Sequence, residues 1–251
     1  MLKLRIIPTL LFKNLKLIKG KKFDSWRTTQ SIMTAVRVYN LRQVDELVLL
    51  DISATNLGEK IDLDLVNEVS NECFMPLTFG GGITSIDDIS SLLKAGADKV
   101  CINTAATKDL KFIKKACETF GSQSIVVSVD YKIIDKKICI FSNSGNEQTD
   151  LEFEKYLIRL EESGVGEIIL TSIDRDGTMI GYDIDTIKLA SKTLKIPLIA
   201  SGGAGDFENM LKLTKQANIS GLAAASIYHF TVNTPLDVKK YLNKHNVPIR
   251  I

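Results

Sequence analysis

Residues 46–53, ELVLLDIS, return 121 positions later as residues 167–174, EIILTSID. Two more pairs of segments keep this offset: residues 80–82 (GGG) with 201–203 (SGG), and residues 101–104 (CINT) with 222–225 (LAAA). One offset shared by three pairs is hard to obtain by chance, so it indicates an internal repeat. We expect a single domain made of two similar halves, roughly residues 1–121 and 122–251.

Short apolar runs alternate with amphipathic stretches along the whole chain. The runs are nearly continuous in Val, Ile and Leu, as in strands buried on both faces; they cover residues 5–11, 46–51, 77–79, 99–102, 125–130, 167–171, 198–200 and 221–224. Expected helices cover residues 31–40, 61–73, 86–95, 107–119, 151–163, 182–193, 206–216 and 235–244. Eight such strand–helix units in a chain of this length predict the α/β class and one (β/α)8 barrel.

Composition excludes several classes of protein. The chain has 251 residues, a formal charge of +2 and 45% hydrophobic residues, so it is neither a disordered polymer nor a basic nucleic-acid-binding domain. No apolar run approaches the length needed to span a bilayer. The four cysteines and two histidines lack metal-site spacing, so we expect no metal, no cofactor, reduced thiols and a cytoplasmic location.

Small residues follow four of the expected strands, where a barrel places its active site. They are residues 80–82, 103–104, 201–203 and 224–226. Small residues leave backbone N–H groups open at helix N-termini, which is the arrangement that binds anions. The pattern predicts two phosphate sites on opposite sides of the mouth; the alternative is that the glycines only permit tight turns.

Carboxylates stand at the ends of other strands. Asp51 ends the second strand, Asp130 the fifth, and Asp174 and Asp176 follow the sixth. A carboxylate delivered to the barrel top by an apolar strand is a candidate general acid or base. Asp51 and Asp174 could equally cap the next helix. Asp130 is the better catalytic candidate, because no helix follows it at once.

Three further features are local. Residues 130–145 alternate around Asp135-Lys136-Lys137 and predict a hairpin after the fifth strand. Residues 12–23 hold five lysines and are expected to form a basic loop, either a flap that closes on phosphate or a solvated segment. Two cations and two anions begin strands and point to the barrel's other end, either as a ring of ion pairs or as unrelated surface charges: Arg5, Glu46, Lys99 and Glu167.

Several segments carry a specific resemblance over essentially the whole chain. Residues 5–8 (RIIP), 45–55 (DELVLLDISAT), 80–83 (GGGI), 96–106 (GADKVCINTAA), 169–183 (ILTSIDRDGTMIGYD) and 199–208 (IASGGAGDFE) resemble the cyclase subunit of imidazole glycerol phosphate synthase. The resemblance implies a barrel paired with a glutaminase subunit. Ammonia would pass through the barrel to a substrate with a phosphate at each end, giving imidazole glycerol phosphate and an aminoimidazole carboxamide ribotide.

The resemblance also implies roles for individual residues. The four charges at the strand starts match the family's ammonia gate, Asp98 matches a contact to the glutaminase, and Asp130 matches one of two catalytic aspartates. The residues expected to bind the phosphorylated substrate are Lys19, Asp51, Gly81, Gly82, Asn103, Thr104, Thr171, Asp176, Gly177, Ser201, Gly202, Gly203, Ala224, Ala225 and Ser226.

Three positions depart from the family's pattern. Leu11 stands where the other catalytic aspartate belongs, and leucine can neither transfer a proton nor hydrogen-bond a substrate. The family's Gly-Asp-Pro run before the first helix is replaced by residues 28–30 (TTQ), and Asp150 stands where the family usually has glycine. All three lie in or near the expected catalytic face, while the gate residues are kept.

Two functions follow from this pattern. The first is a cyclase of histidine biosynthesis that uses glutamine-derived ammonia. The second is a cyclase-deficient paralogue that conducts ammonia from a glutaminase to a separate amidotransferase, which modifies a sugar of a surface polysaccharide. Leu11 favours the second function, whereas Asp130, Lys19 and the phosphate loops favour the first. A purely structural role is disfavoured because both phosphate loops are kept.

Overall fold

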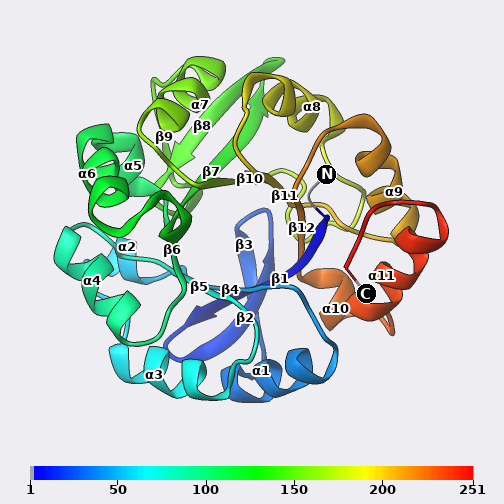
Figure 1. The fold of residues 1–251 in the computed structure, drawn as a ribbon. Coiled ribbons are helices and arrows are strands. Elements are labelled where there is room, and N and C mark those ends of the chain that lie inside the picture. Colours follow the sequence, from blue (N-terminus) through cyan, green and yellow to red (C-terminus); the bar gives the residue numbers. More distant parts are fainter. Residues whose placement is uncertain (1–2, 251) are drawn as a thin grey trace.

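The computed structural model describes residues 3–250 and shows a closed barrel of eight parallel strands (Figure 1). Each strand pairs in parallel with the next, and β12 closes the ring on β1. The predicted (β/α)8 barrel is confirmed. Its strands are β1 (Arg5–Lys13), β4 (Leu47–Asp51), β5 (Leu77–Gly80), β6 (Lys99–Ile102), β7 (Ile125–Ile134), β10 (Glu167–Ser172), β11 (Leu198–Ser201) and β12 (Gly221–Ala224).

Helices surround the barrel (Figure 1). They are α1 (Ile32–Leu41), α2 (Ala54–Leu57), α3 (Leu63–Glu72), α4 (Ile86–Lys94), α5 (Thr104–Lys108), α6 (Leu110–Phe120), α7 (Phe153–Glu162), α8 (Ile184–Thr193), α9 (Phe207–Gln216), α10 (Ser226–His229) and α11 (Pro235–Lys244). The expected helix over residues 107–119 is wrong in its start. Asp109 accepts a hydrogen bond from the Lys111 N–H and so begins α6, after the separate short helix α5.

The strands bury two sets of apolar side chains, because successive side chains point to opposite faces. The outer set packs against the helices and forms the large core. The inner set lines the middle of the barrel lumen with small and medium side chains: Ile7, Val48, Cys101, Val126, Ile169, Ile199 and Ala223. The barrel interior is therefore apolar at mid-height.

The expected basic loop over residues 12–23 is instead part of an antiparallel meander. β1 runs on to Lys13, and β2 (Lys16–Lys21) pairs with it and with β3 (Asp24–Ser31). Asn14 and Leu15 both take positive φ angles (49° and 58°), as hairpin turns of type I′ require. The sequence analysis missed β2 because its lysines resemble those of a solvated loop. Leu17 and Ile18, which lie between the lysines, are buried as in a strand.

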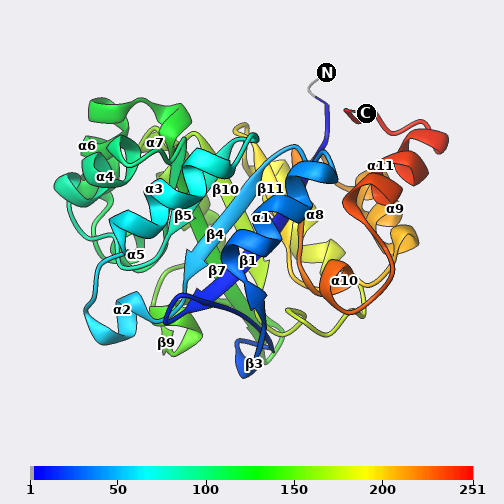
Figure 2. The same cartoon turned by 90° about the horizontal axis from the view of Figure 1, so that it is seen from below.

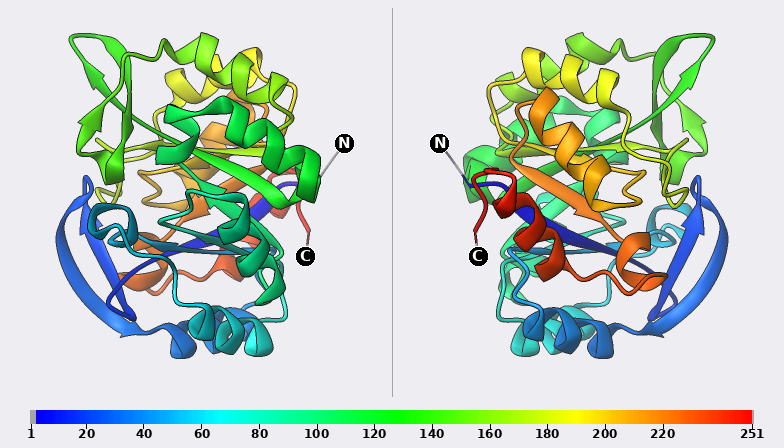
Figure 3. Two further views of the ribbon diagram at one scale, coloured as in Figure 1. Left: turned by 90° about the vertical axis from the view of Figure 1, so that its left-hand side faces the viewer. Right: turned by 90° about the vertical axis from the view of Figure 1, so that its right-hand side faces the viewer.

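The predicted hairpin after the fifth strand is confirmed. β7 extends past Asp130 and pairs with β8 (Lys137–Ser142) around a turn at Asp135 and Lys136. A 3-10 turn, η2 (Asn143–Gly145), and β9 (Glu147–Gln148) follow, and a second 3-10 turn, η1 (Ser122–Ser124), precedes β7. The β2–β3 hairpin of the meander and the β7–β8 hairpin both lie at the end of the barrel opposite the chain termini (Figures 2 and 3).

No helix within residues 3–250 is long and apolar enough to cross a membrane.

Candidate active site

The barrel mouth beside the hairpins holds a cavity of about 550 Å³ at the carboxyl ends of the strands. It brings together Asp130 and all fifteen residues expected to bind substrate, and Leu11 lines the same cavity. Asp174 does not line it. Its carboxylate accepts a hydrogen bond from the Ile133 N–H at 3.0 Å, so it anchors the β7–β8 hairpin.

The two glycine turns of the cavity come from β5 and β11. Gly81 has φ of 118° and lies so close to Asp51 that an added Cβ would be 2.3 Å from its carbonyl oxygen. Gly203 has φ of 104° and meets the Gly181 carbonyl in the same way at 2.2 Å. Tight turns thus explain both glycines, and the turns also border the cavity on two sides.

Asp130 is the buried acid of the cavity. Its side chain accepts hydrogen bonds from the Ser128 hydroxyl at 2.8 Å and the Asn103 amide at 3.1 Å, and it is 8% exposed. Burial, helped by the nearby charge of Asp176, raises the pKa of the Asp130 carboxyl to about 7. A carboxyl with this pKa is present in both forms near neutral pH, so it can donate or accept a proton.

Leu11 places a buried aliphatic side chain in the same cavity, at the end of β1. The other strand-end carboxylate, Asp51, is engaged in local hydrogen bonds. Its Oδ1 accepts from the N–H groups of Ser53 and Ala54 at 2.8 and 3.1 Å, and from the Ser53 hydroxyl at 2.7 Å. Asp51 thus ties its strand to the start of α2, where Ser53 is the N-cap, so its role is close to the capping alternative that the sequence left open.

Lys19 and Asp176 form an ion pair inside the cavity. The Lys19 Nζ lies 2.9 and 3.2 Å from the two carboxylate oxygens, and the lysine side chain is 4% exposed. The Lys22 N–H also donates to the Asp176 carbonyl at 2.8 Å. The β2–β3 hairpin is thus fastened across the mouth to the segment after β10.

Sequence reasoning missed the three aromatic residues that line the cavity, Phe23, Trp26 and Phe112. Trp26 is the single tryptophan of the chain and packs over Gly20, where an added Cβ would lie 2.6 Å from its ring. Phe23 ends the segment that was expected to form a basic loop, and Trp26 lies three residues beyond it. Together with Leu11 and Leu50, these rings make much of the cavity wall apolar.

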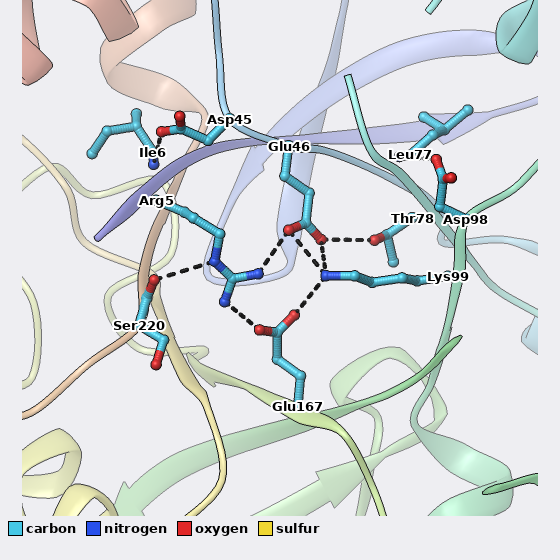
Figure 4. A network of polar contacts seen from close by, with 10 residues as sticks. All are labelled: Arg5, Ile6, Asp45, Glu46, Leu77, Thr78, Asp98, Lys99, Glu167 and Ser220. Atoms are coloured by element: carbon cyan, nitrogen blue, oxygen red, sulfur yellow. Dashed lines mark hydrogen bonds and ion pairs between the residues drawn. The ribbon is translucent and has the colours of Figure 1, made fainter. Parts of the chain in front are cut away.

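A second site lies at the opposite end of the lumen, where the four strand-start charges form a closed ring (Figure 4). Glu46 pairs with Arg5 at 2.8 Å and with Lys99 at 2.9 Å. Glu167 pairs with Lys99 at 3.1 Å and also with Arg5. The Thr78 hydroxyl donates to Glu46 at 3.0 Å. The four charges are therefore one network and not separate surface groups.

Asp98 lies at this end of the barrel and is exposed. Its Oδ2 accepts a hydrogen bond from the Leu77 N–H at 2.8 Å.

Within residues 3–250, no cluster of three or more His, Cys, Asp or Glu side chains is arranged to hold a metal ion.

Residues 5–234 match the protein family described as "Histidine biosynthesis protein". The chain belongs to this family. It is 41% identical to imidazole glycerol phosphate synthase subunit HisF of Chlorobaculum tepidum and 42% identical to the HisF subunit of Dictyoglomus thermophilum. It is 43% identical to a Campylobacter jejuni protein that is provisionally named subunit hisF2 of the same synthase. Each alignment covers 100% of both chains, so the likeness to HisF extends over the whole barrel.

Proposed function

We propose that the chain is the cyclase subunit of a glutamine-dependent synthase of the imidazole glycerol phosphate type. A glutaminase bound at the ring end supplies ammonia, which reacts in the cavity with a ribosyl substrate carrying two phosphates. The products are imidazole glycerol phosphate and an aminoimidazole carboxamide ribotide. The observation that carries this proposal is that a charged ring and a 550 Å³ cavity lie at the two ends of one apolar lumen.

The lumen has the chemistry that passage of ammonia needs. Its middle is lined by aliphatic side chains such as Ile7, Val48 and Ile169. Burying a charge among such groups costs far more than burying a small neutral molecule, so the lumen favours NH3 over NH4⁺. The ring is closed by four ion pairs in this structure, so passage requires at least one of them to open.

The cavity has groups for a substrate that is anionic at both ends. The turns at Gly81-Gly82 and Gly202-Gly203 border it on two sides, and each can offer backbone N–H groups to a phosphate. Asp130 lies among the lining residues and holds or releases a proton at its carboxyl oxygens. With Leu11 on β1, Asp130 carries the acid–base chemistry without the partner carboxylate expected for the family.

The test is turnover of the bis-phosphorylated ribosyl substrate by the purified chain with ammonium chloride, and with glutamine in the presence of a glutaminase partner. Growth of a histidine auxotroph that lacks its cyclase, when it carries this chain, supports the synthase. Failure in both assays contradicts it.

Leu11 favours a second candidate, in which the chain conducts ammonia from a glutaminase to a separate amidotransferase that acts on a nucleotide-linked or free sugar of a surface polysaccharide. In that case the auxotroph does not grow, while glutamine-dependent amidation of the sugar requires this chain. Rescue of growth by Leu11→Asp would make the lost carboxylate the cause of the change in function.

A further inference from the structure

Asp45 is a buried carboxylate next to the ring that the proposed reaction does not use. Its Oδ2 accepts a hydrogen bond from the Ile6 N–H at 2.8 Å, and its Oδ1 accepts one from Lys239 Nζ at 2.8 Å. Lys239 comes from α11, is 3% exposed and also donates to the Gln43 carbonyl at 2.7 Å. A cation from the helix layer is thus buried against an aspartate at the base of the barrel.

Asp45 and Ile6 are the outward-facing neighbours of two ring residues. Successive side chains of a strand alternate between faces, so Arg5 and Glu46 face the lumen while Ile6 packs in the outer core. The Asp45 N–H donates to the Ile6 carbonyl at 3.3 Å, which makes the contact reciprocal. β4 begins only at Leu47, so Asp45 continues the β1–β4 pairing to the level of the ring.

The same arrangement occurs at another ring residue. Asp98 precedes Lys99, its Oδ2 accepts from the Leu77 N–H at 2.8 Å, and its own N–H donates to the Leu77 carbonyl at 2.9 Å. Figure 4 draws both aspartates beside the ring. Two ring residues are therefore each preceded by an aspartate that bonds to the start of the neighbouring strand. Asp45 differs from Asp98 in being buried and paired with a lysine.

We propose that Asp45, neutralised by Lys239, is a positioning residue of the ammonia gate. It fixes the backbone of Glu46 against that of Arg5, so that their side chains meet inside the lumen and close the ring. Through Lys239 it also ties the gate to α11. The inference rests on the proposed function, because the ring must act as a gate for its geometry to affect ammonia transfer.

Two double variants separate positioning from stability. Asp45→Leu with Lys239→Met removes both charges and the acceptor for the Ile6 N–H. Asp45→Asn with Lys239→Met removes the same charges but keeps an amide oxygen for that N–H. Neither leaves an unpaired buried charge, which would be strongly destabilising by itself. Lys240→Met, at an exposed position of the same helix, is the control.

The readouts are product formed per glutamine hydrolysed by the complex with a glutaminase, and product formed from ammonium chloride. We expect the Leu/Met variant to lose several-fold in product per glutamine, with the Asn/Met variant and the control close to wild type. The ammonium-driven rate is expected to stay unchanged in all four proteins. Equal coupling in the two double variants, or a parallel loss of both readouts, would overturn the proposal.

Amide hydrogen exchange of the isolated chain distinguishes failure of this inference from failure of the proposed function. We expect the Ile6 amide to exchange about tenfold faster in the Leu/Met variant than in the Asn/Met variant, because a buried N–H loses its acceptor. Equal exchange of the Ile6 amide in the two double variants overturns the positioning role of Asp45, whichever reaction the chain catalyses. If the Ile6 amide does exchange faster in the Leu/Met variant but the wild-type complex transfers no glutamine nitrogen, the result would instead contradict the proposed function.

Discussion

At the scale of single residues, the proposed chemistry depends on Asp130 and Leu11. They line the same cavity, one as a carboxyl with a pKa of about 7 and the other as a buried aliphatic group. Proton transfer by a positioned side chain contributes about 10²–10⁴-fold to a rate. We therefore propose that the side chain at position 11 decides between an efficient cyclase and a barrel that mainly delivers ammonia.

Leu11→Asp is expected to raise ammonium-driven turnover of the bis-phosphorylated substrate by about 10²-fold or more, because it returns a second proton-transfer group. The matched variant is Leu11→Asn, which is polar and similar in size but has no titrating proton. Steady-state rates of substrate consumption make the comparison. Equal rates for the two variants would show that position 11 does not exchange protons.

Asp130 also makes stability depend on pH. Its pKa is about 7 when folded and near the ordinary 3.8 when unfolded, so between these values the folded state binds more protons. Stability from this group is present at low pH and is lost as pH rises through 7, by up to about 4 kcal/mol.

We expect the free energy of unfolding of the wild type, relative to that of Asp130→Asn, to decrease as the pH rises from 4 to 7. Urea unfolding of both proteins at several pH values measures it. A constant difference would contradict the raised pKa.

At the scale of elements, the β2–β3 hairpin decides how the cavity is closed. Lys19 holds it to Asp176 from inside, and Phe23 and Trp26 form its inner apolar surface. The remaining lysines of β2 and its turns, such as Lys16 and Lys21, are exposed. The buried Lys19 therefore holds the hairpin to Asp176, whereas the exposed lysines do not contribute to this contact.

Lys19→Met is expected to free the hairpin, because losing one partner of a buried ion pair costs about 3–5 kcal/mol at that contact. Fluorescence of Trp26, the single tryptophan, should then shift to longer wavelength as its ring becomes more exposed to water. Lys21→Met, on the exposed side of the same strand, should leave the emission unchanged. An identical spectrum in both variants would show that the Lys19–Asp176 pair does not hold the hairpin.

The sequence predicted those elements whose signal is local. The eight barrel strands lie within a few residues of the expected ranges because buried parallel strands are continuous runs of Val, Ile and Leu. β2 was missed because its lysines resemble a solvated loop, although Lys19 is buried. The break between α5 and α6 depends on a side-chain cap at Asp109, which an apolar periodicity does not register.

The candidate site was predictable in its location but not in its contacts. Asp130 and all the residues expected to bind substrate line the cavity, because the carboxyl ends of barrel strands meet at one face. Asp174, the other acid-base candidate after the sixth strand, does not line it and bonds to the β7–β8 hairpin. The roles of Asp51 and Asp174 could not be decided from position alone, since both follow strands. Their hydrogen-bond partners Ser53, Ala54 and Ile133 come from the folded loops.

At the scale of the whole molecule, the barrel separates two surfaces. The chain termini lie at one end of the barrel and the hairpins at the other (Figure 2). The charged ring lies at the end with the termini, and the cavity lies at the end with the hairpins. The apolar lumen between them is the direct route from one to the other. We therefore propose that a reaction using glutamine nitrogen at the cavity depends on the ring.

Lys99→Ala removes the cation that joins Glu46 to Glu167 and leaves only Arg5 to bridge them. We expect this variant to form less product per glutamine hydrolysed, with its ammonium-driven rate unchanged. Unchanged coupling would mean that the ring is a structural network only.

The most direct test of the account follows the nitrogen itself. The complex with a glutaminase is given glutamine labelled with ¹⁵N at its amide, the bis-phosphorylated substrate and an excess of unlabelled ammonium. If ammonia travels through the barrel, mass spectrometry should show product that carries mostly ¹⁵N, and Lys99→Ala should dilute the label. Product with the isotope ratio of the surrounding ammonium would contradict transfer through the lumen.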